Sequence, residues 1–174
     1  QAWLIRTNRR ELHRVLGRWS WLLVAILVGA GFVMLKRMLQ STGPFEQAFA
    51  PLLVFIDVTS LAYFVGAYLV ALALRRKMHL HARLMVSTVV LVLPPAIARL
   101  LLNAGVPGFP IALHASLACA ELVALALIVH DARRWRVQPP YVVLLAFLVV
   151  QHAAMGFVAA SPAWLAACRW YAAA

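Results

Sequence analysis

Five ionisable side chains lie within long apolar segments of this sequence, where groups of these types can bind a proton or a ligand. They are Asp57, Arg99, His114, Glu121 and His152. An ionisable group inside a membrane-spanning helix costs about 2.5–3.5 kcal/mol on insertion scales, and it normally faces the bundle interior and pairs with another group. We therefore treat the five residues as an intramembrane polar cluster, which either holds helices together or binds a proton or a ligand.

Asp57 and Arg99 carry opposite charges and fall at similar depths in their apolar segments. If the two side chains meet, each charge offsets much of the other's cost of burial. We predict an ion pair that joins two successive membrane helices. A proton site or a ligand site at the same residues is the alternative.

His114 and Glu121 are seven residues apart, which is about 700° of helical rotation, so their side chains share one face of a helix. No basic residue is expected at the depth of Glu121. We therefore expect a protonated carboxyl held by a hydrogen bond. A purely structural role and a proton-handling role for Glu121 both stay open.

His114 and His152 are the two histidines whose depth and inward orientation permit a shared ligand. Histidine is a common axial ligand of haem iron. His114 and His152 are therefore candidate ligands of a single b-type haem, or candidate neighbours of a bound quinone. The alternative is two structural histidines, each with a hydrogen-bond partner. Cys119 and Cys168 differ too much in depth for a disulfide.

The composition indicates the elements that position these residues. The chain has 174 residues, of which 65% are hydrophobic and 12% charged, and its mean hydropathy is +0.89. A soluble domain is rarely so apolar. A membrane helix needs about 17–25 apolar residues. We predict an all-α polytopic bundle of about five transmembrane helices, at residues 19–39, 50–74, 82–103, 109–130 and 140–160. Pro94 and Pro95 should interrupt the third helix.

The net charge of +11 is interpreted through topology, and not as a sign of nucleic-acid binding. Twelve of the 16 Lys and Arg residues fall on one side of the predicted bundle. The positive-inside rule makes that side, and with it the N-terminus, cytoplasmic. We expect three parts: a basic amphipathic interfacial segment at 1–18, the transmembrane bundle at 19–160 and a short non-cytoplasmic tail at 161–174. The basic residues expected to face anionic lipid head groups are Arg14, Arg18, Arg75, Arg76, Lys77, His81 and Arg83.

Two short motifs carry a family resemblance. Residues 13–18 read H-R-V-L-G-R, and residues 81–85 read H-A-R-L-M and open a helix that ends with Arg99. These segments resemble those of an uncharacterised family of predicted bacterial polytopic membrane proteins, which implies an inner-membrane fold and no established activity. More weakly, H-x-R-L-M is similar to a segment of membrane proteins that assist haem-copper oxidase assembly. The K-x-H-x-H spacing at 77–81 is similar to that of b561-type cytochromes.

The sequence thus favours a multi-pass protein of the bacterial cytoplasmic membrane that acts as an accessory or interaction subunit without catalysis of its own. Its expected partners are the lipid bilayer and other membrane-protein subunits. One alternative is a redox carrier that binds haem b or quinone at His114 and His152. A second alternative is a small transporter that uses Asp57, Arg99 and Glu121.

Overall fold

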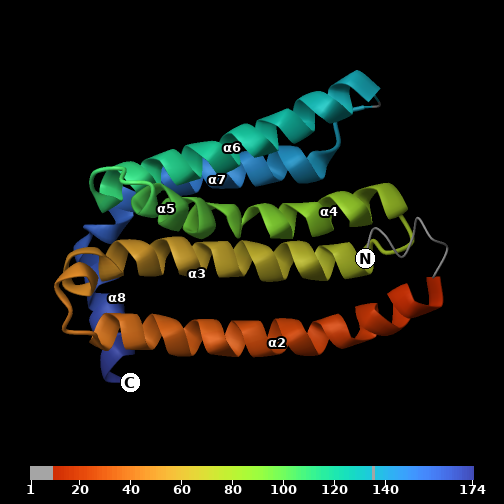
Figure 1. Cartoon of the computed structure of the whole chain (residues 1–174). Helices are drawn as coiled ribbons and strands as arrows, with labels where there is room; N and C mark the ends of the chain where they lie inside the picture. Colours follow the sequence, from red (N-terminus) through yellow and green to blue (C-terminus); the bar gives the residue numbers. More distant parts are fainter. Residues whose placement is uncertain (1–9, 135) are drawn as a thin grey trace.

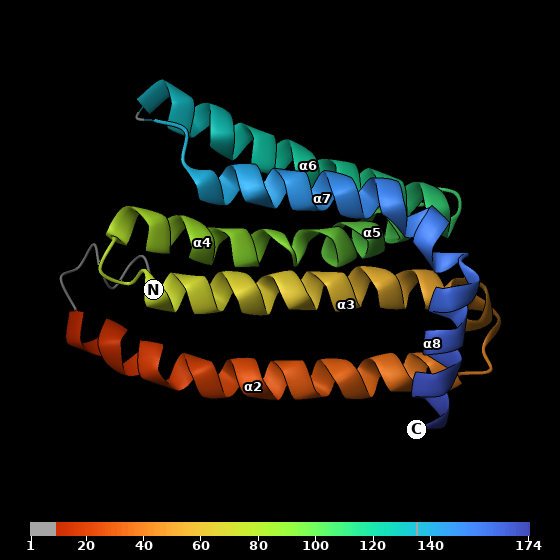
Figure 2. The same cartoon turned by 180° about the vertical axis from the view of Figure 1, so that it is seen from behind.

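The computed structural model describes residues 10–134 and 136–174, and every helix or strand assigned within them is an α-helix. Figures 1 and 2 show most of these helices running side by side along one axis, with the last helix lying across one end of the bundle. The described helices are α2 (Arg10–Gln40), α3 (Pro44–Ala73), α4 (Met78–Val90), α5 (Leu93–Asn103), α6 (Phe109–Arg134), α7 (Pro139–Ala159) and α8 (Pro162–Ala173).

Five segments of the described chain are long and apolar enough to cross a membrane, which confirms the predicted number. They contain 21 to 30 residues each. At a rise of about 1.5 Å per residue, even the shortest spans the ~30 Å hydrocarbon core. The five segments are Glu11–Gln40, Pro44–Ala73, Met78–Asn103, Phe109–Arg134 and Pro139–Ala159.

The first helix is longer than predicted. α2 continues without a break from Arg10 to Gln40, so residues 10–18 belong to the same helix as the predicted first membrane span. The remainder of the predicted segment, residues 1–9, lies outside the described residues. A helix of 31 residues is about 46 Å long. Its arginine-rich first turns therefore have room to project beyond the hydrocarbon core.

The third span is interrupted, as we predicted from the two prolines in the sequence. α4 ends at Val90, and α5 begins at Leu93, one residue before Pro94. A proline ring clashes with the carbonyl four residues earlier and supplies no N–H group, so Pro94 and Pro95 cannot continue the hydrogen-bond ladder of α4. At the break, the N–H of Val92 donates to the carbonyl of Val89 at 3.1 Å.

Small residues allow α6 to approach its neighbours closely. Ala120 and Ala124 are completely buried in a core cluster with Val90 of α4 and with Leu144 and Leu148 of α7. Alanines spaced four residues apart leave room for the facing helices, which is the common way to pack helices in membranes. This cluster fixes α6 and α7 side by side, and thereby positions the polar residues that the two helices carry.

Most of the predicted C-terminal tail, residues 161–174, is the helix α8. Ser161 caps α8 by accepting a hydrogen bond from the N–H of Trp164. The indole N–H of Trp164 donates to the carbonyl of Pro51 at 2.8 Å, and the hydroxyl of Tyr171 donates to the carbonyl of Phe32 at 2.8 Å. These contacts hold α8 across the ends of α2 and α3 (Figures 1 and 2). Cys168 of α8 is buried in a cluster with Leu35 of α2 and Val54 of α3, and both cysteines are free.

The opposite end of the bundle carries most of the positive charge. α2, α4 and α7 begin there, and α3 and α6 end there (Figure 1). We call this end of the bundle the basic end, because it holds Arg75, Arg76, Lys77, Arg133, Arg134 and Arg136.

Candidate functional site

Three ionisable residues of α6 and α7 form one hydrogen-bonded chain. His152 of α7 lies at its centre: Nδ1 of His152 is 2.8 Å from Oε1 of Glu121, and Nε2 of His152 is 2.8 Å from Nδ1 of His114. The two imidazole rings have centroids 5.1 Å apart and planes inclined by 34°. Because Glu121 and His114 both contact His152, they share one face of α6. We call these three residues the Glu–His–His chain.

The direction of the hydrogen bonds in the Glu–His–His chain depends on the protonation state of Glu121. If Glu121 is a carboxylate, its oxygen accepts a hydrogen bond from Nδ1–H of His152, because a carboxylate cannot donate. Nε2 of a neutral His152 then accepts from Nδ1–H of His114. Nε2 of His114 is left as a free acceptor at the end. A proton that binds this nitrogen can drive two successive transfers, from His114 to His152 and from His152 to Glu121.

The Glu–His–His chain lies deep along the helix but is not enclosed. Glu121 is the thirteenth residue of α6, which places it about 18 Å from the start of the helix. Its side chain is 22% exposed, that of His152 is 21% exposed, and His114 is an exposed residue. Ionisable groups at membrane depth usually face a bundle interior or a water-filled cavity. Here they lie instead at the outer surface of the α6–α7 pair.

The geometry of the two histidines does not provide the spacing of axial haem ligands. Such ligands stand on opposite faces of a porphyrin with the iron between them. Nδ1 of His114 and Nε2 of His152 are instead joined directly by a 2.8 Å hydrogen bond. A haem between these residues stays a prediction that requires their rings to separate. Within the described residues, no group of three or more His, Cys, Asp or Glu is arranged to hold a metal ion.

Asp57 and Arg99 do not form a direct ion pair. Among the described residues, none of the ion pairs within 4.0 Å joins them. The side chain of Asp57 is half-buried on α3, whereas that of Arg99 is exposed on α5. α3, which carries Asp57, packs mainly against α4, whereas α5, which carries Arg99, packs mainly against α6.

A buried amide joins α3 to α7 beside the Glu–His–His chain. Gln151 is 4% exposed, and its Nε2 donates to the carbonyl of Ile56 at 3.0 Å and to the hydroxyls of Thr59 and Ser60 at 2.7 and 3.0 Å. Sequence analysis did not single out this residue. The available signal was a lone amide next to His152 in an otherwise apolar segment.

At the basic end, Arg83 forms a buried ion pair that the sequence analysis missed. Its Nε donates to Oδ2 of Asp131 at 2.6 Å and its Nη2 to Oδ1 at 2.8 Å, while Asp131 is only 3% exposed. Nη1 of Arg83 also donates to the carbonyl of His79 at 2.9 Å. Two planar, parallel hydrogen bonds make this the strongest type of ion-pair geometry. Arg83 therefore ties α4 to α6, whereas we had expected it to contact lipid.

The other residues expected to contact head groups fall into two sets. His81 is half-buried, and its Nδ1 donates to the carbonyl of Ala71 at 2.8 Å, so it also links α4 to α3. The remaining five side chains are exposed, as contact with head groups requires: Arg14, Arg18, Arg75, Arg76 and Lys77.

Compared with protein-family models, with curated proteins and with solved structures, the chain gives no match. The resemblance to an uncharacterised bacterial membrane-protein family therefore stays a prediction. What the fold provides is a helical bundle with five helices long and apolar enough to cross a membrane. The function has to be inferred from its polar residues.

Proposed function

We propose that this protein is an interaction subunit of a larger complex in the bacterial cytoplasmic membrane, with its basic end on the cytoplasmic side. The observation that supports this proposal is the partial exposure of the Glu–His–His chain on the outer surface of α6 and α7. We propose that a partner subunit covers this surface.

The energetic reason is that lipid tails cannot satisfy the exposed polar atoms. Nε2 of His114 has no hydrogen-bond partner among the described residues, and Glu121 is 22% exposed about 18 Å along its helix. A polar group in an apolar environment without a partner costs several kcal/mol. A partner helix with a hydrogen-bond donor opposite His114 would remove most of this cost. Polar side chains commonly hold membrane helices together in this way.

Two neighbouring valines of α7 allow a matched test. Val149 and Val150 are both exposed. On a helix of 100° per residue, Val149 lies about 60° from His152, and Val150 about 160° from it. A photo-crosslinking amino acid at position 149 would therefore probe the face of the Glu–His–His chain. The same amino acid at position 150 would probe nearly the opposite face at almost the same depth.

We expect irradiation of native membranes to give one discrete protein adduct for the variant at position 149, and mainly lipid adducts for the variant at position 150. The protein adduct at position 149 must become weaker when Glu121→Gln or His114→Ala is added to that variant, because these changes alter the surface that the partner contacts. Adducts that contain only lipid at both positions would contradict the proposal.

A further inference from the structure

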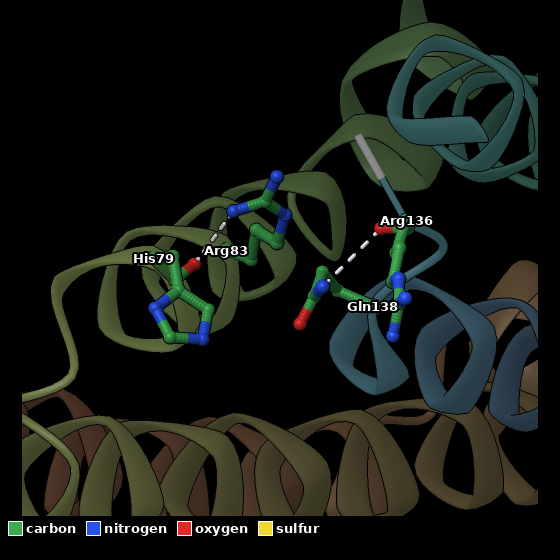
Figure 3. Close-up of a pocket in the computed structure, with 4 residues that line it drawn as sticks. All are labelled: His79, Arg83, Arg136 and Gln138. Atoms are coloured by element: carbon green, nitrogen blue, oxygen red, sulfur yellow. Dashed lines mark hydrogen bonds between the residues drawn. The ribbon is translucent and has the colours of Figure 1, made fainter. Parts of the chain in front are cut away.

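An open pocket of about 570 Å³ lies at the basic end, away from the Glu–His–His chain. It is lined by His79 and Arg83 of α4 and by Arg136 and Gln138 of the connection between α6 and α7. Figure 3 shows the side chains of Arg136 and Gln138 across the gap from those of His79 and Arg83. Its volume falls within the range of about 300–1,000 Å³ that is typical of small-molecule sites.

The guanidinium of Arg83 is held in place by hydrogen bonds that leave some of its N–H donors unused. A guanidinium has five N–H groups. Three of those of Arg83 are used, two on Asp131 and one on the carbonyl of His79. One N–H therefore remains on each of Nη1 and Nη2. Because Asp131 fixes the plane of the guanidinium, these two donors are oriented before any ligand binds.

The charge around the cavity is positive even after Asp131 is counted. Asp131 balances Arg83, but no ion pair within 4.0 Å neutralises Arg136 among the described residues. α4 begins at Met78 with no acidic residue in its first turn and no side-chain cap. The positive end of the α4 dipole is therefore left without an anionic partner near His79.

We propose that this cavity binds a phosphate group. Two guanidinium side chains, an imidazole and an amide supply hydrogen-bond donors of the kind that recognise phosphate oxygens. α6 has 26 residues and is about 39 Å long, so its end projects beyond a ~30 Å hydrocarbon core to the level of lipid head groups. The phosphate can belong to an anionic phospholipid or to a free ion. The proposal does not rest on the proposed function, because it uses other residues at the other end of the bundle.

The test uses Arg136→Gln, with Arg134→Gln as its matched control. Both arginines are exposed at the same end of the bundle, but only Arg136 lines the cavity. One arm measures retention of phosphatidylglycerol on the purified full chain by native mass spectrometry. The second arm measures binding of inorganic phosphate to the chain in discs of neutral lipid. Thermal unfolding of each variant confirms that the fold is intact.

We expect the unmodified chain and Arg134→Gln to bind one phosphate-bearing ligand equally well, and Arg136→Gln to bind it about tenfold more weakly or worse, because a charge-assisted hydrogen bond is lost. Binding in the first arm alone identifies the lipid as the source, and binding in both arms identifies phosphate itself. The proposal is overturned if the two variants weaken binding equally, which indicates diffuse surface charge. It is also overturned if the unmodified chain binds neither ligand.

Discussion

Replacing Arg83 by Ala is expected to lower the free energy of unfolding by about 3–5 kcal/mol, because the change leaves Asp131 as a buried charge without its partner. Asp131 is 3% exposed and both of its oxygens accept hydrogen bonds from Arg83. No other basic side chain is within 4.0 Å of it among the described residues. The measurement is reversible unfolding of the protein in lipid bicelles.

The double variant Arg83→Met with Asp131→Leu removes both charges but keeps side chains of similar volume at the two positions. An apolar pair of similar volume should restore much of the lost stability, since no charge is then left buried. Arg76→Ala is the control for removing an exposed arginine at the same end, and should change stability by no more than about 0.5 kcal/mol. If the losses from Arg83→Met alone and from Asp131→Leu alone add up to the loss in the double variant, Arg83 and Asp131 do not interact.

Replacing His152 by Ala is expected to destabilise the protein by about 2 kcal/mol or more, and His114→Ala by about 1 kcal/mol. Hydrogen bonds between membrane helices contribute about 1–2 kcal/mol in model peptides and less in some proteins. His152 makes two such bonds, and its loss also leaves Glu121 without a partner. His114 makes one, at the end of the chain. The same unfolding measurement gives both values.

Val150→Ala serves as the control for trimming an exposed side chain of α7. If His114→Ala costs as much as His152→Ala, the central position of His152 is wrong. If both variants behave like Val150→Ala, the three residues do not stabilise the bundle.

The membrane spans could be predicted because they depend on local composition. A long apolar segment bounded by charges or turn residues specifies a membrane helix without reference to the rest of the chain. The break before Pro94 could be predicted for the same reason, since the proline ring acts on its own helix. α8 could also have been predicted, because Trp164, Cys168 and Tyr171 recur at the helical spacing of four and three residues.

The partners of the polar residues could not be predicted, because depth along a helix fixes neither its rotation nor its neighbours. Matched depth suggested that Asp57 pairs with Arg99, yet no ion pair within 4.0 Å joins them among the described residues, and α5 packs mainly against α6. Arg83 and Asp131 are 48 residues apart and meet only through the packing of α4 near α6. Glu121 lacked an expected basic partner, because the depth of His152 on α7 was estimated only from the end of its own segment.

The central claim is that Glu121, His152 and His114 form one hydrogen-bonded chain, and nitrogen NMR of the protein in lipid bilayers tests it most directly. With histidine labelled with nitrogen-15, Glu121→Gln should shift the resonances of His152 and also those of His114, which Glu121 reaches only through His152. The resonances of His79 and His130 should stay unchanged and act as internal controls. A spectrum in which Glu121→Gln leaves His114 unchanged would contradict the account.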